Sequence, residues 1–375
     1  MKVLLTGSTG YIGRRLKQKL LNDENIELKL LVRNKKSVSS LNENTQIIEG
    51  DTFNKESLKE ALKDVEVAYY LIHSLSNENY KDLDKTSAQN FLDIAAECGV
   101  KRIIYLGGLG VKDENTSEHL LSRIETGEIL SSNKNVQTIW LRAGVIIGSG
   151  SASFEIIRNL TEKLPIMTTP KWVNTKAQPI AVTDVLSYLH KSLYLDVKEN
   201  LIVDIGSEQL SYKNMMLKTA KVLGLKRILI TLPFMSIKLS SYWLNLFTPV
   251  PYAVAKALVE GLKSEVIIQN DHAKKYFPNI LPISYEDAVA NAIKEIEENQ
   301  VISRWNDKAD DVWEKNSQNE LSKAIFIDRK EMVISNIEAS KVYQAFIGIG
   351  GENGWFDFDF LWELRGIIDK LIGGV

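Results

Sequence analysis

The chain has 375 residues, a formal net charge of −2, and 44% hydrophobic and 25% charged residues, values that are ordinary for a folded protein. This length allows a large core and more than one domain. The near-neutral charge gives no electrostatic reason to expect nucleic acid or a strongly anionic membrane as a partner. A single cysteine, Cys98, excludes an internal disulfide, and four histidines leave little room for a metal cluster, so no metal site is predicted.

The beginning of the chain predicts a dinucleotide-binding loop. An apolar strand is expected over residues 2–6, and it leads through Thr6-Gly7-Ser8-Thr9-Gly10-Tyr11-Ile12-Gly13 into a helical pattern. The three glycines suit a tight turn, a close approach of the backbone to a pyrophosphate and a helix packed close to the sheet. The phosphates would lie at the helix N-terminus, where N–H groups and the dipole favour anions. We therefore expect Gly7, Ser8, Thr9, Gly10, Tyr11, Ile12 and Gly13 to bind cofactor. Because the chain starts with a core strand, we expect no signal peptide and a cytoplasmic location.

The first half of the chain alternates short apolar runs with helical patterns, which is typical of a parallel sheet covered on both faces. Further strands are expected over residues 27–32, 46–49, 66–72, 102–107 and 136–142. One helix is expected over 81–97, ending before Gly99, and the helix after the fifth strand is expected to begin near Asn115, with Glu118 as its capping partner. The fold class is thus α/β, with a Rossmann-type doubly wound parallel sheet.

The second half predicts a helical substrate lobe and a further domain. From residue 144 the pattern loosens around several glycines and prolines, and a mostly helical tract follows over about 211–297. The composition shifts near 299, and four of the seven tryptophans lie beyond that point. We predict one NAD(P)-binding domain over 1–298, with a nucleotide-binding core over 1–143 and the lobe over 144–298. Residues 299–375 would begin a second, partial α+β domain, and the apolar C-terminus suggests a truncated one.

The most apolar region runs from Ile228 to Val266. Its uncharged stretch between Lys238 and Lys256 approaches the length of a membrane span, but Pro249 and Pro251 interrupt it. We interpret this region as buried or interfacial helices, which allow peripheral membrane contact but no transmembrane segment. The part from 242 to 262 could form the face of a homodimer.

Residues that follow the second to fourth strands are expected to select the cofactor. Arg33 ends the second strand, where a carboxylate would favour NAD, and arginine suits the 2′-phosphate of NADP. NADP is therefore favoured over NAD, although a solvated basic turn is the alternative interpretation. Asp51, which is followed by Thr52, can accept a hydrogen bond from the exocyclic amine of adenine. The alternative is that Asp51 only stabilises the backbone of its own turn. Leu71, Ile72 and His73 end the fourth strand beside the expected cofactor path, where a locally satisfied histidine is an equal alternative.

These segments together resemble the short-chain dehydrogenase/reductase superfamily in its extended and atypical branches. The resemblance covers about residues 1–297 and depends on the glycine loop, Asp51, the strand Val100–Gly107, the segment Leu141–Gly144, and the segment Gln178–Val185, which looks like a return strand and the helix after it. The segments Tyr69–Leu75 and Gly107–Gly110 are similar to a bacterial atypical subgroup that often carries an uncharacterised C-terminal domain, and Trp355–Gly374 looks like the start of that domain.

The resemblance implies catalytic positions that this chain fills unusually. Active members of the superfamily use a tyrosine, a lysine four residues later and a serine that ends the fifth strand. Here the corresponding residues are His119, Arg123 and either Gly107 or Gly108. His119 could transfer a proton near neutral pH, and Arg123 could bond ribose hydroxyls but cannot act as a base. We therefore predict His119 and Arg123 as catalytic, and Gly107 and Arg123 as cofactor contacts. The alternative is that His119 only lines the cleft.

Three functions are compatible with these residues. The first is an NADP-dependent oxidoreductase acting on a carbonyl or quinone-like small molecule. The second is a non-catalytic NADP(H)-binding protein that serves as a redox sensor or an assembly scaffold. Nucleotide-sugar epimerisation or dehydration is a third, which the missing tyrosine and lysine weaken.

Overall fold

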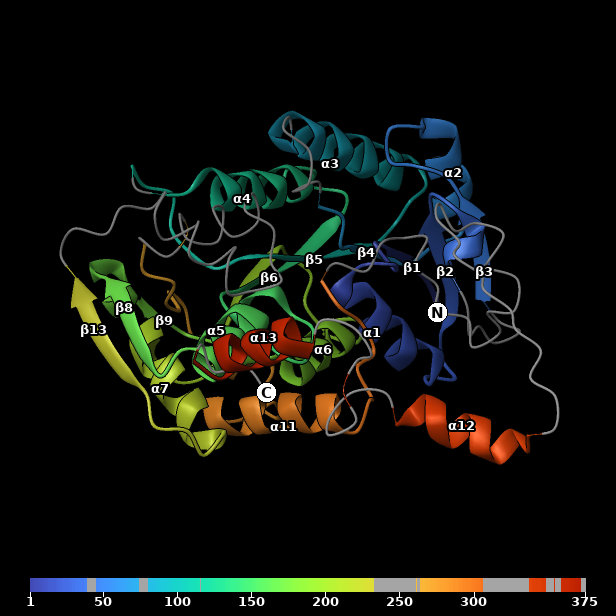
Figure 1. Ribbon diagram of the computed structural model, residues 1–375. Helices are drawn as coiled ribbons and strands as arrows, with labels where there is room; N and C mark the ends of the chain where they lie inside the picture. Colours follow the sequence, from blue (N-terminus) through green and yellow to red (C-terminus); the bar gives the residue numbers. More distant parts are fainter. Residues whose placement is uncertain are drawn as a thin grey trace. The chain divides into compact units, whose positions relative to one another are not determined.

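A seven-stranded parallel sheet forms the centre of the chain in the computed structural model (Figure 1). The structure describes residues 1–38, 45–73, 80–114, 116–232, 261, 264–305, 337–348, 354 and 359–371. The strand order is β11 (Leu201–Ile205), β6 (Gln137–Ala143), β5 (Arg102–Gly108), β4 (Val67–Tyr70), β1 (Lys2–Thr6), β2 (Glu27–Val32) and β3 (Thr45–Glu49). The order reverses between β1 and β4, so ligands are expected at the carboxyl ends of these two strands.

Alternate side chains of each strand face two separate cores, which explains why helices cover both sides of the sheet. On β1, Val3 and Leu5 belong to one core, and Leu4 belongs to the other. Helices α1 (Tyr11–Leu21) and α6 (Val182–Lys191) cover the first face, and α2 (Lys55–Leu62), α3 (Tyr80–Glu97) and α4 (Glu118–Leu130) cover the second (Figure 1). The predicted Rossmann-type α/β fold is confirmed.

The six predicted strands are present, with ends that differ from the predicted ones by at most two residues. The seventh strand, β11, was not predicted. It pairs in parallel with β6 and carries Asp204, which is fully buried and forms two hydrogen bonds with Arg142 of β6, at 2.6 and 3.0 Å. A charged residue in a short apolar run argues against a buried strand when the sequence is considered alone. Here Asp204 is compatible with burial because its partner, Arg142, comes from a distant part of the sequence.

The start of α4 differs from the prediction. The helix begins at Glu118, and the hydroxyl of Ser117 caps it by accepting a hydrogen bond from the backbone N–H of Leu120, at 3.3 Å. Asn115, the predicted first residue, lies outside the described residues. Serine and asparagine are almost equally good caps, so the sequence alone could not choose between them.

The lobe after β6 packs around a third core that α5 (Ala152–Lys163), α7 (Tyr212–Val222) and α11 (Tyr285–Glu297) share. The tract predicted as mostly helical also contains β13 (Ile228–Leu232), which pairs in parallel with β8 (Ile166–Pro170). The predicted return strand and helix correspond to β10 (Ile180–Ala181) and α6. The remaining short elements are β7 (Ile146–Ile147), β9 (Lys176–Ala177), β12 (Leu210–Ser211), α10 (His272–Tyr276) and the 3-10 helices η1 (Lys35–Ser37) and η2 (Lys171–Asn174).

The chain divides into two compact units, Met1–Val312 and Trp313–Val375. The first unit continues past the boundary that we predicted at 298, since the hydroxyl of Ser303 donates to the carbonyl of Tyr11 at 2.9 Å. In the described part of the second unit the elements are α12 (Ala339–Ile347) and α13 (Asp359–Leu371). The predicted α+β character and truncation of that region stay predictions.

Most of the apolar region between Ile228 and Val266 lies outside the described residues, and so does most of the dimer face predicted over 242–262. The homodimer and the peripheral membrane contact stay predictions.

Within the described ranges, none of the helices combines the length and the apolar character needed to cross a membrane.

Candidate cofactor site

The loop between β1 and α1 has a backbone that only glycine permits at two positions. Gly7 has a φ of +69°, and a Cβ there would lie 2.5 Å from the carbonyl oxygen of Leu71. A Cβ on Gly13 would overlap the carbonyl group of Gly7. The N–H of Gly10 donates to the Gly7 carbonyl at 3.0 Å, which closes the turn. The loop thus joins the sheet to α1 with no space for a side chain at Gly7 or Gly13.

The N-terminus of α1 offers unpaired donors. Its capping residue is Gly10, which has no side chain to bond the first N–H groups, and the first turn, Tyr11 to Gly13, contains no acid. The hydroxyl of Ser8 is buried and has no hydrogen-bond partner in the described structure. Leaving such a group unpaired costs about 1–3 kcal/mol. A pyrophosphate at this position would accept from these donors, so the residues present fit a dinucleotide.

The turn after β2 presents Arg33 to solvent. The Asn34 side chain accepts from the N–H of Lys36 at 2.9 Å, and Glu49 of β3 accepts from the N–H of Lys35 at 3.1 Å. These bonds hold the turn and leave the Arg33 side chain exposed. Sequence reasoning did not single out Glu49, whose role depends on the pairing of β3 with β2.

Asp51 and Thr52 are partly engaged in local structure. One carboxylate oxygen of Asp51 accepts from the N–H of Phe53 at 3.0 Å. The hydroxyl of Thr52 is buried and accepts from Ser87 of α3 at 2.7 Å. These bonds match the interpretation of Asp51 as a turn residue. A contact with adenine stays a prediction that involves the other carboxylate oxygen.

Three predicted residues meet beyond the carboxyl ends of β4 and β5. The rings of His73 and His119 have centroids 4.9 Å apart. The Arg123 side chain donates to the carbonyl of Leu106 at 3.3 Å, and the carbonyl of Arg123 accepts from the Tyr105 hydroxyl at 2.9 Å. Leu71 and Ile72, which precede His73, pack on opposite cores. Local segments that were predicted separately therefore form one polar cluster.

Asp84 of α3 completes this cluster and was missed from the sequence. Its carboxylate lies 3.0 Å from Nδ1 of His73 and accepts from the Ser122 hydroxyl at 3.1 Å. The side chain of Asp84 is only 5% exposed. Asp84 shares the buried face of α3 with Ala88 and Phe91, so an acid at helical spacing from apolar residues was the available signal.

Burial decides the protonation of the two histidines. It lowers the pKa of His119 to about 2, and the nearby positive charge of Arg123 acts in the same direction. His119 is therefore neutral at neutral pH. Burial and Arg123 also lower the pKa of His73, but the hydrogen bond that its ring donates to Asp84 opposes this shift.

Of the two positions expected to carry a serine, Gly107 has no space for one, and Gly108 has space only if the end of the Leu120 side chain moves. A Cβ on Gly107 would overlap the indole nitrogen of Trp140, and a Cβ on Gly108 would lie 2.6 Å from the side chain of Leu120. Gly107 can therefore contact a cofactor only through its backbone.

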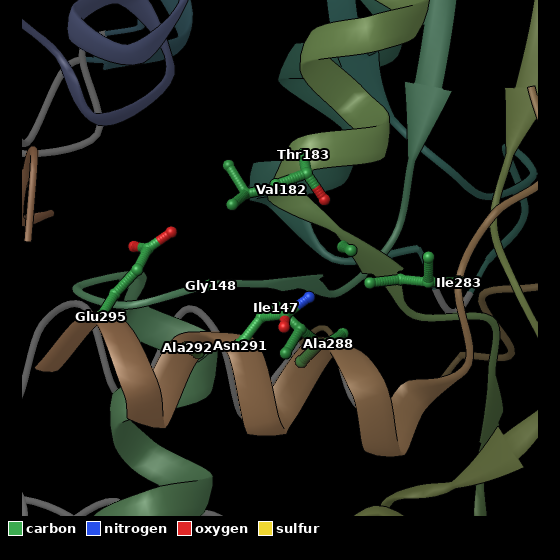
Figure 2. Close-up of a pocket in the computed structure, with 10 residues that line it drawn as sticks. Ile147, Gly148, Val182, Thr183, Ile283, Ala288, Asn291, Ala292 and Glu295 are labelled. Atoms are coloured by element: carbon green, nitrogen blue, oxygen red, sulfur yellow. The ribbon is translucent and has the colours of Figure 1, made fainter. Parts of the chain in front are cut away.

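A small cavity of about 10 Å³ lies between the start of α6 and α11 (Figure 2). Figure 2 shows Thr183 of α6 across from Asn291 and Glu295 of α11. This volume holds at most one water molecule, so the cavity is not a substrate site. A larger open hollow of about 530 Å³ is lined by Lys63 and Asp64, which precede β4, and it therefore lies at the amino ends of the strands.

Comparison with known proteins agrees with the geometry of the loop. Residues 7–143 match the model of a family described as NAD(P)H-binding. This segment is an NAD(P)H-binding domain. The chain is also 31% identical over 125 residues to the auxiliary protein GraX of Staphylococcus aureus. That match covers 32% of this chain and only 40% of the length of GraX.

Solved structures extend the similarity beyond this domain at the level of the fold. A nucleoside-diphosphate-sugar epimerase from Staphylococcus aureus superposes with a TM-score of 0.64 and 15% identity, covering 77% of this chain and 100% of the epimerase. The Citrobacter triphenylmethane reductase complexed with NADP(H) superposes with a TM-score of 0.63 and 21% identity, covering 77% of this chain and 99% of the reductase. These structures confirm the Rossmann-type fold that was expected, and the family match supports the NAD(P)H-binding segment within it.

Proposed function

We propose that the protein is an NADP(H)-dependent oxidoreductase that acts on a carbonyl or quinone-like small molecule. The observation that carries this proposal is the cluster of His73, His119 and Arg123 at the switch point of the sheet, beside a loop with unpaired donors. A ligand-binding crevice is expected at that point in doubly wound sheets. The cluster thus supplies polar side chains where the reactive half of the cofactor would lie.

In this proposal each predicted residue has one task toward the cofactor. The Ser8 hydroxyl and the first N–H groups of α1 hold the pyrophosphate, with Thr9 and Gly10 in the loop around it. Arg33 holds the 2′-phosphate, and Asp51 with Thr52 lies at the adenine. Leu71, Ile72 and the backbone of Gly107 line the nicotinamide half. When bound, NADP(H) would supply or accept the hydride. Arg123 would bond the ribose hydroxyls because its guanidinium always carries donors.

The choice of reductase over epimerase depends on the residues of the site, because the epimerase and the reductase share the fold of this chain about equally, with TM-scores of 0.64 and 0.63. The tyrosine and lysine that sugar-modifying relatives of this superfamily would use are replaced here by His119 and Arg123.

The test of this proposal has two stages. NADPH and NADH are titrated into the purified protein by calorimetry, and the oxidation of bound NADPH is followed after addition of aldehydes and quinones. We expect tighter binding of NADPH and turnover with at least one acceptor. Failure to bind either cofactor would remove the basis of the proposal.

A non-catalytic role is the second candidate, and a specific observation favours it. Burial lowers the pKa of His119 so far that its ring holds a proton poorly near neutral pH, and a serine at Gly107 would overlap Trp140. The protein would then bind NADP(H) as a redox sensor or an assembly scaffold. Tight NADPH binding with no oxidation by any acceptor is the result that this role predicts.

A further inference from the structure

His73 differs from the other site histidine in having a carboxylate partner. Its Nδ1 lies 3.0 Å from a carboxylate oxygen of Asp84, whose side chain is 5% exposed. An ionised carboxylate only accepts hydrogen bonds, so Nδ1 of His73 carries the hydrogen. The neutral ring then has a lone pair on Nε2, and this atom is buried with no hydrogen-bond partner in the described structure.

His119 has no comparable partner. Its Nδ1 is buried and unpaired within the described structure, and among the titratable groups around it Arg123 and His73 lower its pKa, whereas Asp84 raises it. An imidazolium at His119 would face a positive neighbour with no direct contact to an acid. At His73 the same positive ring would keep its hydrogen bond to Asp84, which opposes in part the lowering of its pKa by burial and by Arg123.

We propose that Nε2 of His73 is the atom that accepts and returns the substrate proton. Asp84 keeps this nitrogen unprotonated in the neutral ring by holding the hydrogen on Nδ1. The inference rests on the proposed function and replaces His119 in the role predicted from the sequence. Within the substrate class of the proposed function it specifies an alcohol–carbonyl pair, because the O–H of an alcohol can give its proton to the bare nitrogen.

The step balances without another reagent. In alcohol oxidation Nε2 would take up the proton of the substrate oxygen, and the hydride of the substrate carbon would go to NADP⁺, which is the chemistry that this cofactor would supply when bound. The carbon–oxygen bond becomes a carbonyl, and the ring becomes an imidazolium whose Nδ1–H still faces Asp84. Carbonyl reduction is the reverse, with the proton returning from Nε2 to oxygen.

The location of His73 agrees with this role. His73 follows β4, and Leu71, two residues earlier, is a close neighbour of the dinucleotide loop. A Cβ on Gly7 would lie 2.5 Å from the carbonyl oxygen of Leu71. The histidine therefore belongs to the same edge of the sheet as the dinucleotide loop. Asp84 is a positioning residue, since it acts only through the ring of His73.

Because the chain has only four histidines, nitrogen–proton correlation spectra of the imidazole rings can be assigned with single variants. We expect His73 to show hydrogen on Nδ1 and a bare Nε2, and Asp84→Asn to change that tautomer. Ser122→Ala is the matched control, since it removes a different hydrogen bond to the same carboxylate. A wild-type ring with its hydrogen on Nε2 would overturn the inference, whatever the activity.

The second measurement is aldehyde-dependent NADPH oxidation. His73→Gln should lower kcat by at least about 100-fold with little change in NADPH affinity. His190→Gln serves as the control and should keep wild-type activity, because the His190–Asp23 pair, at 2.9 Å, lies on the face of the sheet that α1 and α6 cover, whereas Asp84 and His119 lie on α3 and α4 at the opposite face. Turnover that survives His73→Gln overturns this inference alone. NADPH binding without any turnover by the wild type overturns the proposed function, and this inference with it.

Discussion

Replacing Gly107 with alanine tests whether the missing serine of this site is excluded by packing. The backbone of Gly107 is not in the left-handed region, so alanine brings no conformational strain. Its Cβ would overlap the indole nitrogen of Trp140 and lie 2.9 Å from a ring carbon of Tyr105. The indole cannot retreat on its other side, since a Cβ on Gly127 would also overlap it.

Overpacking of this kind costs about 1–3 kcal/mol, and the restraint on both sides of Trp140 places Gly107→Ala near about 3 kcal/mol. The free energy of unfolding is measured by urea denaturation, with the slope checked for constancy. Trp140→Phe removes the overlapping nitrogen, so the double variant should lose less stability than the sum of the single variants. A cost below about 0.5 kcal/mol, or additive costs, would refute the packing argument.

Three further predictions concern the cofactor and the pH. Arg33→Ala should weaken NADPH by about 10- to 100-fold and NADH much less, because it removes a charge-assisted contact to the 2′-phosphate; calorimetry showing equal losses would contradict this. Gly13→Ala should abolish NADPH binding. Gly10→Ala should weaken it less, because a Cβ on Gly10 would lie 3.3 Å from the nearest atom. The reverse order of the two losses in affinity would argue against the loop geometry. Burial lowers the pKa of His119 from its ordinary value of 6.5 to about 2 in the folded chain. Below pH 6.5 the unfolded chain therefore binds a proton that the folded chain does not bind. The free energy of unfolding then falls as the pH drops, by up to about 1.4 kcal/mol per pH unit. His119→Gln should therefore flatten the fall in unfolding free energy between pH 6.5 and 5, and an unchanged slope would show that the ring protonates in the folded state.

The sequence by itself determined the class of the fold, six of the seven central strands and the dinucleotide loop. These features depend on short-range patterns: the alternation of apolar runs with helical periods, and glycines spaced between a strand and a helix. The close contact of Gly13 with Gly7 is local, so its requirement for glycine can be read from the spacing alone.

Only the tertiary structure decided the chemistry of the candidate site. Asp84 is an isolated acid in the sequence, and it becomes a partner of His73 because α3 packs beside the end of β4. β11 was concealed for the same reason, since Asp204 is tolerated in a buried strand only beside Arg142 of β6. The low pKa of His119 follows from burial and from the charges around it, and neither can be read from its neighbours in the chain. Long-range pairing of charges therefore determines which histidine can hold a proton, whereas local patterns are sufficient to build the fold that brings them together.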